Sequence, residues 1–356
     1  ALVKGMGGGP SAAAKEEGVL QERFTQAIDL LKKAPGARKG LFGGSSLYDL
    51  PWYVFVGAPG SGKTTALLNA GLNFPLTEKL GQASVRGVGG TRNCEWWFSD
   101  EAVLIDTAGR YATQDSDKDT DAAAWDTFLG LLRRARPRRP INGVLLTISV
   151  QDLLALPPDQ RKEQASRMRG RMQELQQRLG VKVPVYVMVT KCDLLAGFNE
   201  TFGPMGKEER DQVFGFTFPL ATQPGEETLA NFGSEFASLE KRLRERLIER
   251  MEAESDTLKR ATIFAFPQQF GGLKGLLGGY LETVFGGSGA LDEAPRLRGV
   301  YFTSGTQEGT PIDRVLGALA RTFGVERRLT PPAAAKGRSY FLNHLLRRVI
   351  FVEQGL

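Results

Sequence analysis

Residues 57–64 read Gly57-Ala-Pro-Gly60-Ser61-Gly62-Lys63-Thr64, and this stretch decides the fold. It matches the pattern G-x-x-x-x-G-K-[ST] in full, between the apolar run Leu50–Val56 and a helical stretch at 65–69. In this pattern the glycines let successive backbone N–H groups point at phosphate oxygens, and the dipole of the following helix adds positive potential. We therefore expect a strand, a phosphate-binding loop and a helix in that order.

The polar residues of this loop have distinct expected roles. Lys63 would reach the β- and γ-phosphates of a nucleotide and act in catalysis, and the Thr64 hydroxyl would bind Mg²⁺. The other expected nucleotide contacts come from Gly57, Gly60, Ser61, Gly62 and Thr65. A glycine-rich turn without a ligand is the alternative interpretation.

A second motif, Asp106-Thr-Ala-Gly109, ends the apolar run Val103–Ile105. In nucleotide hydrolases an aspartate at the end of a buried strand holds Mg²⁺, and we expect the Gly109 N–H to contact the γ-phosphate. Arg110 stands where GTPases resembling Ras carry the glutamine that orients the attacking water. We therefore expect slow hydrolysis, with Arg110 stabilising transition-state charge, pointing away, or pairing with a neighbouring acid.

Two further segments complete the expected nucleotide site. Thr91, in the glycine-rich stretch 87–92, would close over Mg²⁺ as a switch segment does, unless this stretch only leads into a hairpin. Thr190-Lys191-Cys-Asp193 matches the pattern [NT]-K-x-D, in which the aspartate accepts hydrogen bonds from guanine and the lysine covers its ring. A turn capped by Asp193 is the alternative. The expected ligand is GTP or ATP with Mg²⁺, and GTP is slightly favoured.

The order of the apolar runs predicts the fold class. Strands expected at 93–98 and 102–105 are joined by three residues, which suits antiparallel neighbours only. Strands expected at 144–150 and 183–190 flank a helix at 158–179, an alternation typical of parallel sheets. The sequence predicts an α/β, P-loop GTPase-like fold: a mostly parallel sheet with one antiparallel hairpin, helices on both faces, and a helical extension or insert.

We expect five successive parts along the chain. They are a flexible lead-in and N-terminal helix at 1–45, an NTPase core at 46–197, an inserted helical subdomain at 198–258, a return to the core at 259–330, and a linker and C-terminal helix at 331–356.

Finer expectations concern the second half of the chain and the lead-in. We expect residues 1–18 to be flexible, Thr228–Leu258 to form one long charged helix, and Thr262–Phe266 to form a strand. The guanine-side loop would be Phe266–Phe270 rather than Thr303–Thr306, because it comes sooner after Asp193. The apolar stripe of the helix Ser339–Phe351 would dock on the NTPase domain rather than lie free.

Composition excludes several classes of function. The only histidine is His344 and the two cysteines are Cys94 and Cys192, so a histidine-based triad, a histidine metal site and a disulfide framework are excluded. A formal charge of +6 favours an acidic partner, but no aromatic residues interleave the arginines at 133–139, so nucleic acid is disfavoured. These arginines and the charged helix are candidate partner surfaces, with solvated faces as the alternative.

No run approaches the roughly 20 apolar residues of a membrane helix. Because the chain starts at Ala1 rather than Met, we expect a fragment of a longer protein, with any membrane segments outside it.

Four segments together resemble the TssM (IcmF) family, the inner-membrane scaffold proteins of bacterial type VI secretion. They are Leu50-Pro-Trp-Tyr, Gly89-Gly-Thr-Arg-Asn-Cys-Glu-Trp-Trp-Phe, Arg298-Gly-Val-Tyr-Phe-Thr-Ser-Gly-Thr-Gln-Glu-Gly and Ser339-Tyr-Phe-Leu. The resemblance implies a GTPase-like domain between two membrane helices, on the cytoplasmic face of the inner membrane, in contact with TssL and other membrane-complex or baseplate components.

Three functions remain open at this point. The first is a nucleotide-binding module of a secretion scaffold that hydrolyses GTP or ATP slowly. The second is a structural interaction module with a vestigial nucleotide pocket. The third is a soluble regulatory GTPase or one of the signal-recognition type, which the short hairpin at 93–105 disfavours.

Overall fold

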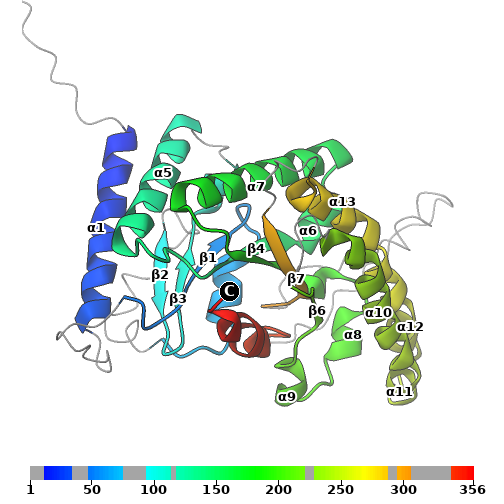
Figure 1. The fold of residues 1–356 in the computed structure, drawn as a ribbon. Coiled ribbons are helices and arrows are strands. Elements are labelled where there is room, and N and C mark those ends of the chain that lie inside the picture. The colour runs from blue at the N-terminus through cyan, green and yellow to red at the C-terminus, as the bar shows by residue number, and fades with distance from the viewer. Residues whose placement is uncertain are drawn as a thin grey trace, which may run out of the picture.

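The computed structural model describes residues 12–33, 47–74, 94–113, 118–220, 228–287, 295–305 and 338–356. Within them lies a seven-stranded sheet in the order β2-β3-β1-β4-β5-β7-β6, with helices on both faces (Figure 1). The strands are β1 (Trp52–Val56), β2 (Glu95–Phe98), β3 (Val103–Asp106), β4 (Gly143–Ser149), β5 (Pro184–Thr190), β6 (Gly215–Thr217) and β7 (Arg296–Phe302).

The five inner strands of the sheet run parallel. The two edge strands are antiparallel, β2 to β3 and β6 to β7. The expected mostly parallel sheet with an antiparallel hairpin is therefore confirmed. The second antiparallel edge, β6, is an addition, and it comes from a segment that the sequence predicted to be helical.

The helices gather in two groups along the sheet. Beside β1–β5 lie α1 (Ala12–Lys33), α2 (Lys63–Leu68), α4 (Gly109–Thr113), α5 (Lys118–Ala135), α6 (Val150–Ala155) and α7 (Pro158–Leu179). Toward β6 and β7 lie α8 (Phe198–Phe202), α9 (Lys207–Arg210), α10 (Phe232–Glu245), α11 (Leu247–Glu252), α12 (Thr257–Gly271) and α13 (Leu273–Phe285).

The alternation of side chains along β1 divides the core into two layers. Trp52, Val54 and Val56 face the layer that α1, α5, α7 and α13 cover. Tyr53 and Phe55 face the opposite layer, which α2 and the C-terminal segment cover. Every residue of β1 is buried, as expected for an inner parallel strand.

The C-terminal segment packs on the sheet, which confirms the expected docking. The side chains that it buries in the same layer as Tyr53 are Leu342, Leu345, Leu346, Ile350 and Phe351, and Tyr340 and Phe341 are buried in the other layer. The Tyr53 hydroxyl donates to the Ile350 carbonyl at 2.8 Å, which fixes the segment against β1. The helix is shorter than predicted: wide π-type turns span Leu345–Ile350, and a 3₁₀ turn spans Phe351–Glu353.

The structure corrects three predicted elements. Thr262–Phe266 is not a strand: it lies within α12, which begins after an Asp256 side chain that accepts from two backbone N–H groups of the first turn. The expected long helix Thr228–Leu258 is broken into a 3₁₀ turn (Thr228–Asn231), α10 and α11. The N-terminal helix begins at Ala12, inside the predicted flexible lead-in.

The arginine cluster at 133–139 is not a solvated face throughout. Arg136 is 1% exposed, and its guanidinium lies 4.8 Å from the Trp52 ring centre. Burial lowers the pKa of Arg136 to about 10. Arg139 donates to the carbonyls of Gln354 and Gly355 at the end of the chain. Both arginines thus hold the fold together rather than offering a free surface.

Aromatic rings hold the second helical group to the sheet. Phe270 contacts Phe302 of β7, with ring centres 4.8 Å apart, and Phe236 of α10, with ring centres 5.0 Å apart. Phe198, Phe202 and Phe214 extend this cluster toward Phe341.

Among the residues that the structure describes, none of the helices combines the length and the apolar character needed to span a membrane.

Candidate functional site

The expected nucleotide-binding residues meet at one edge of the sheet. The loop 57–62 follows β1, Asp106 ends β3, Thr190 ends β5, and Thr303–Gly305 follows β7. All four strands are parallel, so their carboxyl ends open onto the same side. In open α/β sheets this edge is where ligands bind.

The loop between β1 and α2 needs its glycines. Gly60 and Gly62 have φ angles of 72° and 85°, in the left-handed region that favours glycine. A Cβ on Gly57 would lie 2.1 Å from the Thr147 hydroxyl, and one on Gly109 would lie 2.4 Å from the Pro59 nitrogen. These close approaches require glycine at both positions, so the backbone carries no side chain there.

Lys63 is a buried cation at the start of α2. Its side chain is 6% exposed, and Nζ donates to the carbonyls of Gly57 at 2.8 Å and Ala58 at 3.2 Å. Burial lowers its pKa to about 8, and the nearby Asp106 carboxylate opposes this shift. Near neutral pH the site therefore holds a positive charge that is stripped of water and contacts two neutral carbonyl oxygens.

The hydroxyl of Thr64 and the carboxylate of Asp106 come together, although they lie 42 positions apart. Thr64 Oγ1 donates to Asp106 Oδ2, and Asp106 is fully buried. Hydroxyl and carboxylate oxygens are hard ligands of the kind that Mg²⁺ takes. This donor pair next to the bare loop backbone fits a magnesium–phosphate group.

Two polar contacts attach the loop to neighbouring strands. The Thr190 hydroxyl donates to the Ser61 carbonyl at 2.6 Å, and the Ser61 hydroxyl hydrogen-bonds the Thr147 hydroxyl at 2.8 Å. Thr147 lies in β4 and Thr190 ends β5, so the loop is held from two strands. Thr147 was not among the expected site residues; a polar residue inside the apolar run at 144–150 was the available signal.

Asp193 is held by a serine from after β7. The Ser304 hydroxyl donates to Asp193 Oδ1 at 2.7 Å, and both residues are buried. Backbone hydrogen bonds from Thr303 N to the Val189 carbonyl and from Cys192 N to the Thr303 carbonyl fix the two segments side by side. Lys191 has a left-handed backbone, and its Nζ donates to Gln151 Oε1 at 3.2 Å.

The choice of Phe266–Phe270 as the guanine-side loop was wrong. These residues belong to α12, and Phe266 and Phe270 are buried in the aromatic cluster. The rejected alternative, the segment that starts at Thr303, is the one beside Asp193. Distance along the chain was a poor guide because a helical pair, α12 and α13, intervenes before the adjacent parallel strand.

Arg110 pairs with acids, one of its three expected states. Its guanidinium donates to Asp121 Oδ1 at 2.8 Å and to both carboxylate oxygens of Glu16 on α1. The Tyr111 hydroxyl also donates to Glu16, at 2.8 Å. Asp121 is fully buried, so Arg110 neutralises a buried charge and fastens α1 to α4 and α5.

The remaining expected residues are accounted for as follows. Gly109 begins α4, directly against the loop at Pro59, and Thr65 lies in the first turn of α2. Thr91 lies outside the described residues. Glu16, which accepts from Arg110, was not foreseen, because residues 1–18 were expected to be flexible.

Comparison with known proteins identifies the family. The model for the IcmF-related N-terminal domain matches residues 118–356, more than half of the chain. The chain belongs to the IcmF-related family. The resemblance noted in the sequence is therefore confirmed, and the matched region of this IcmF-related chain contains Thr190, Asp193 and Ser304 but begins after the loop 57–64.

A curated relative of this IcmF-related chain is the type VI secretion system component TssM1 of Pseudomonas aeruginosa. The two are 51% identical over 349 residues, which is 97% of this chain and 31% of the relative. The chain thus spans about a third of the relative's length.

A solved structure of the signal recognition particle receptor SRb-GTP/SRX complex from Chaetomium thermophilum also aligns with the chain. The alignment has 20% identity and a TM-score of 0.26, and it covers 42% of this chain and 75% of that chain. So low a score supports no conclusion about the fold or the ligand.

Proposed function

We propose that this IcmF-related chain is the Mg²⁺-dependent nucleotide-binding module of an inner-membrane scaffold protein in type VI secretion, and that it hydrolyses its nucleotide slowly. The observation that carries the proposal is the buried Lys63 ammonium beside the Thr64–Asp106 pair. A buried cation, a bare loop backbone and two hard oxygen ligands at one strand edge together suit a magnesium-bound phosphate chain. The proposed fold class is that of P-loop GTPases.

The chain's own residues would divide the binding as follows. Lys63 would exchange its two neutral carbonyl acceptors for phosphate oxygens. A hydrogen bond between an ammonium and an anionic oxygen is stronger than one to a neutral carbonyl, so this exchange would stabilise the buried cation. Thr64 and Asp106 would hold the magnesium, Asp106 through water. Gly57, Gly60, Ser61 and Gly62 would bring the loop backbone to the phosphates, and Gly109 would offer its N–H to the terminal one. Bound Mg²⁺ neutralises charge on the phosphate oxygens.

The Asp193–Ser304 contact favours GTP over ATP. A carboxylate fixed by a hydroxyl and held beside Lys191 is suited to accept from the N1 and N2 groups of guanine. Adenine offers no such pair of donors at this edge. Asp193 would therefore read the base, with Thr190 holding the phosphate loop in register with it.

The position of Arg110 supports the proposal of slow hydrolysis. Glu16 and Asp121 occupy its guanidinium, so it is not disposed to stabilise charge on a transferring phosphate. A water-orienting glutamine is missing at this position of the sequence. We propose that the site binds and switches more than it turns over.

The secretion role rests on the family and on the TssM1 relative. We propose that the module lies on the cytoplasmic face of the bacterial inner membrane, and that its partners are TssL and other membrane-complex or baseplate components. Membrane attachment would come from parts of a longer protein.

Isothermal titration calorimetry of the 356-residue chain with GTP, GDP and ATP, with and without Mg²⁺, tests the proposal. Lys63→Ala should weaken binding by about 3 kcal/mol, because a charge-assisted contact in a desolvated site is lost. Lys162→Ala, a change at an exposed lysine of α7, is the matched control and should leave binding unchanged. No heat from any nucleotide with wild-type protein would refute nucleotide binding.

A structural module without nucleotide turnover is the second candidate. The Arg110–Glu16–Asp121 cluster favours it, because this cluster fastens three helices where a hydrolytic residue would be expected. Phosphate release measured on wild type and Lys63→Ala separates the two functions. Equal release by both would leave only the structural role.

A further inference from the structure

A cavity of about 880 Å³ lies in the helical group beside β6, and none of the candidate nucleotide residues lines it. It opens between α8–α9 on one side and α10–α12 on the other. Four buried rings form its apolar floor: Phe202, Phe214, Phe266 and Phe341. The proposed nucleotide function therefore gives this cavity no role.

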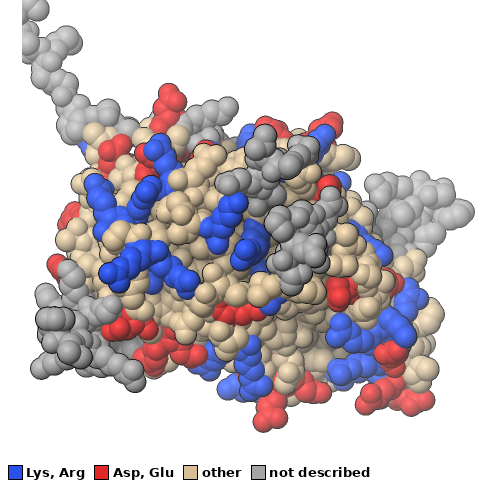
Figure 2. Space-filling view, in the orientation of Figure 1, with Lys and Arg blue, Asp and Glu red and all other residues tan. Residues whose placement is uncertain are grey.

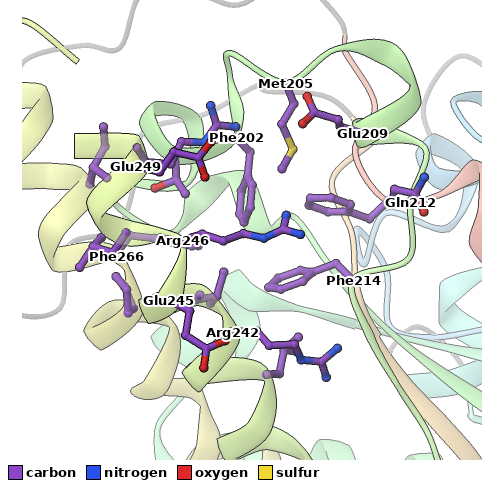
Figure 3. A pocket seen from close by; sticks show the side chains of 18 of the residues that line it. Phe202, Met205, Glu209, Gln212, Phe214, Arg242, Glu245, Arg246, Glu249 and Phe266 are labelled. Carbon is purple, nitrogen blue, oxygen red and sulfur yellow. The ribbon is translucent and has the colours of Figure 1, made fainter. Parts of the chain in front are cut away.

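Arginines line one wall of this cavity. Arg242, Arg246 and Arg250 recur every fourth residue along α10 and α11, so they share a face. Figure 3 shows Arg246 extending across the cavity toward Phe214 and Gln212. Within the described ranges its guanidinium makes no hydrogen bond or ion pair.

The neighbouring face of the same wall carries the opposite charge and an apolar side chain. Glu245, Ile248 and Glu249 follow one another at helical spacing, and Glu245 and Glu249 stand at the cavity edge. Ile248 is 69% exposed, and Leu258, at the start of α12, is 80% exposed. A ridge with apolar and acidic residues therefore lies directly beside a hollow with apolar and basic residues.

Charges around the cavity nearly cancel. Three arginines and four glutamates line it. Figure 2 shows Lys and Arg intermixed with Asp and Glu over the lower right of the molecule, where Figure 1 places α11 and α12. A strongly acidic or strongly basic partner would gain little here, whereas a surface with the same hollow and ridge would match both.

We infer that this surface joins two copies of the chain about a two-fold axis. Ile248 of each copy enters the aromatic hollow of the other, and Glu245 and Glu249 of each copy face Arg246 of the other. A two-fold interface makes every contact twice, so one self-complementary patch is sufficient. The interface buries the exposed Ile248 and gives Arg246 a carboxylate partner.

Sedimentation velocity of the whole 356-residue chain, at concentrations from about 5 to about 500 µM, tests this interface. We expect a reversible monomer–dimer equilibrium within that range. Ile248→Asp should abolish the dimer without lowering the melting temperature, because the side chain is largely exposed in the monomer. A monomer at every concentration, including one that binds a partner protein through this cavity, overturns the inference.

Charge exchange identifies the surface. Arg246→Glu and Glu249→Arg should each weaken the dimer by at least about tenfold, because like charges then face each other across the axis. An equimolar mixture of the two variants should dimerise, and the double variant R246E/E249R should dimerise with itself. Arg134→Glu, an equal charge change on the exposed face of α5, is the matched control and should leave the dimer unchanged. A dimer that survives Arg246→Glu and Ile248→Asp, or a double variant that stays monomeric, overturns the assignment.

Discussion

The candidate site at the sheet edge and the helical group beside β6 hold their side chains by different forces. At the edge, single polar contacts join distant parts of the chain: Thr190 to Ser61, 129 positions apart, and Ser304 to Asp193, 111 apart. Beside β6, rings pack on rings, as Phe270 does on Phe302 and Phe236. Hydrogen bonds fix direction, whereas ring packing mainly fills volume, so the edge is the part that can position a ligand.

Deleting residues 338–356 should break both regions and have the largest effect. The segment buries seven large apolar or aromatic side chains, each worth about 1.5–3 kcal/mol, which together are comparable to the whole stability of a typical domain. We expect a large fall in the melting temperature and binding of a dye that reports exposed apolar surface. Val352→Ala, at a residue 67% exposed in the same segment, is the control. Unchanged melting of the truncated chain would contradict the observed docking.

Phe270→Ala separates the two regions. Its ring is fully buried, and its loss should cost about 3–5 kcal/mol of unfolding free energy in urea. Nucleotide affinity should stay within about twofold, because the rings on which Phe270 packs, Phe214, Phe236, Phe266 and Phe302, are not among the polar residues of the candidate site. Phe264→Ala on the same helix, at a residue 63% exposed, is the control and should cost little. A loss of affinity as large as the loss of stability would show that the two regions are not independent.

The pH dependence of stability tests the burial of Lys63. Burial lowers its pKa from 10.5 to about 8, so between these values the unfolded chain binds more protons than the folded one. Lys63 therefore opposes folding below about pH 8, and its contribution becomes more favourable as pH rises toward 10.5.

Lys63→Met should accordingly be more stable than wild type near pH 7, and this advantage should shrink by up to about 3 kcal/mol by pH 10.5. Urea unfolding at both pH values measures the difference, and Lys162→Met corrects for groups that titrate in both proteins. If the difference between Lys63→Met and wild type does not change with pH, Lys63 is not buried as a cation.

Ser304→Ala should have the smallest effect on stability and a selective one on binding. Without the hydroxyl, Asp193 loses an orienting donor, and the preference for GTP over ATP should fall by about tenfold, near 1.4 kcal/mol. Calorimetry with both nucleotides measures this ratio, and Ser166→Ala on exposed α7 is the control. Equal loss of GTP and ATP affinity would mean that the pair supports the loop but does not read the base.

The sequence predicted the inner sheet well because strands such as β1, β4 and β5 are short apolar runs, whereas the three-residue edge strand β6 (Gly215–Thr217) carries no such pattern and was missed. Local patterns failed where a short apolar stretch is compatible with both a strand and a helix. Residues Thr262–Phe266 include β-branched and aromatic side chains typical of strands, yet they lie in α12, which the Asp256 side chain caps and which buries Ile263 and Phe266. The predicted charged helix Thr228–Leu258 was too long, because charge periodicity does not show where α10 ends and α11 begins.

For the candidate site, sequence motifs predicted residues that the structure does place together, among them Lys63, Thr64 and Asp106. What motifs did not give were contacts made across the fold. Two such contacts are the ion pair of Arg110 with Glu16 and the hydrogen bond of Ser304 to Asp193. Both depend on which helices and strands become neighbours, and spacing along the chain does not show this.

The antiparallel backbone bridge between Ser304 and Tyr340 affects the order in which parts of the molecule can fold. These residues exchange two backbone hydrogen bonds, and Phe341 and His344 donate to the carbonyls of Arg210 and Asp211. During translation Tyr340 leaves the ribosome well after Ser304, so the Ser304 segment cannot take its final support until Tyr340 has emerged. We expect the part of the sheet edge around Asp193 and Ser304 to mature last, and a nascent chain to be unable to complete the candidate nucleotide site until residues 338–344 have emerged.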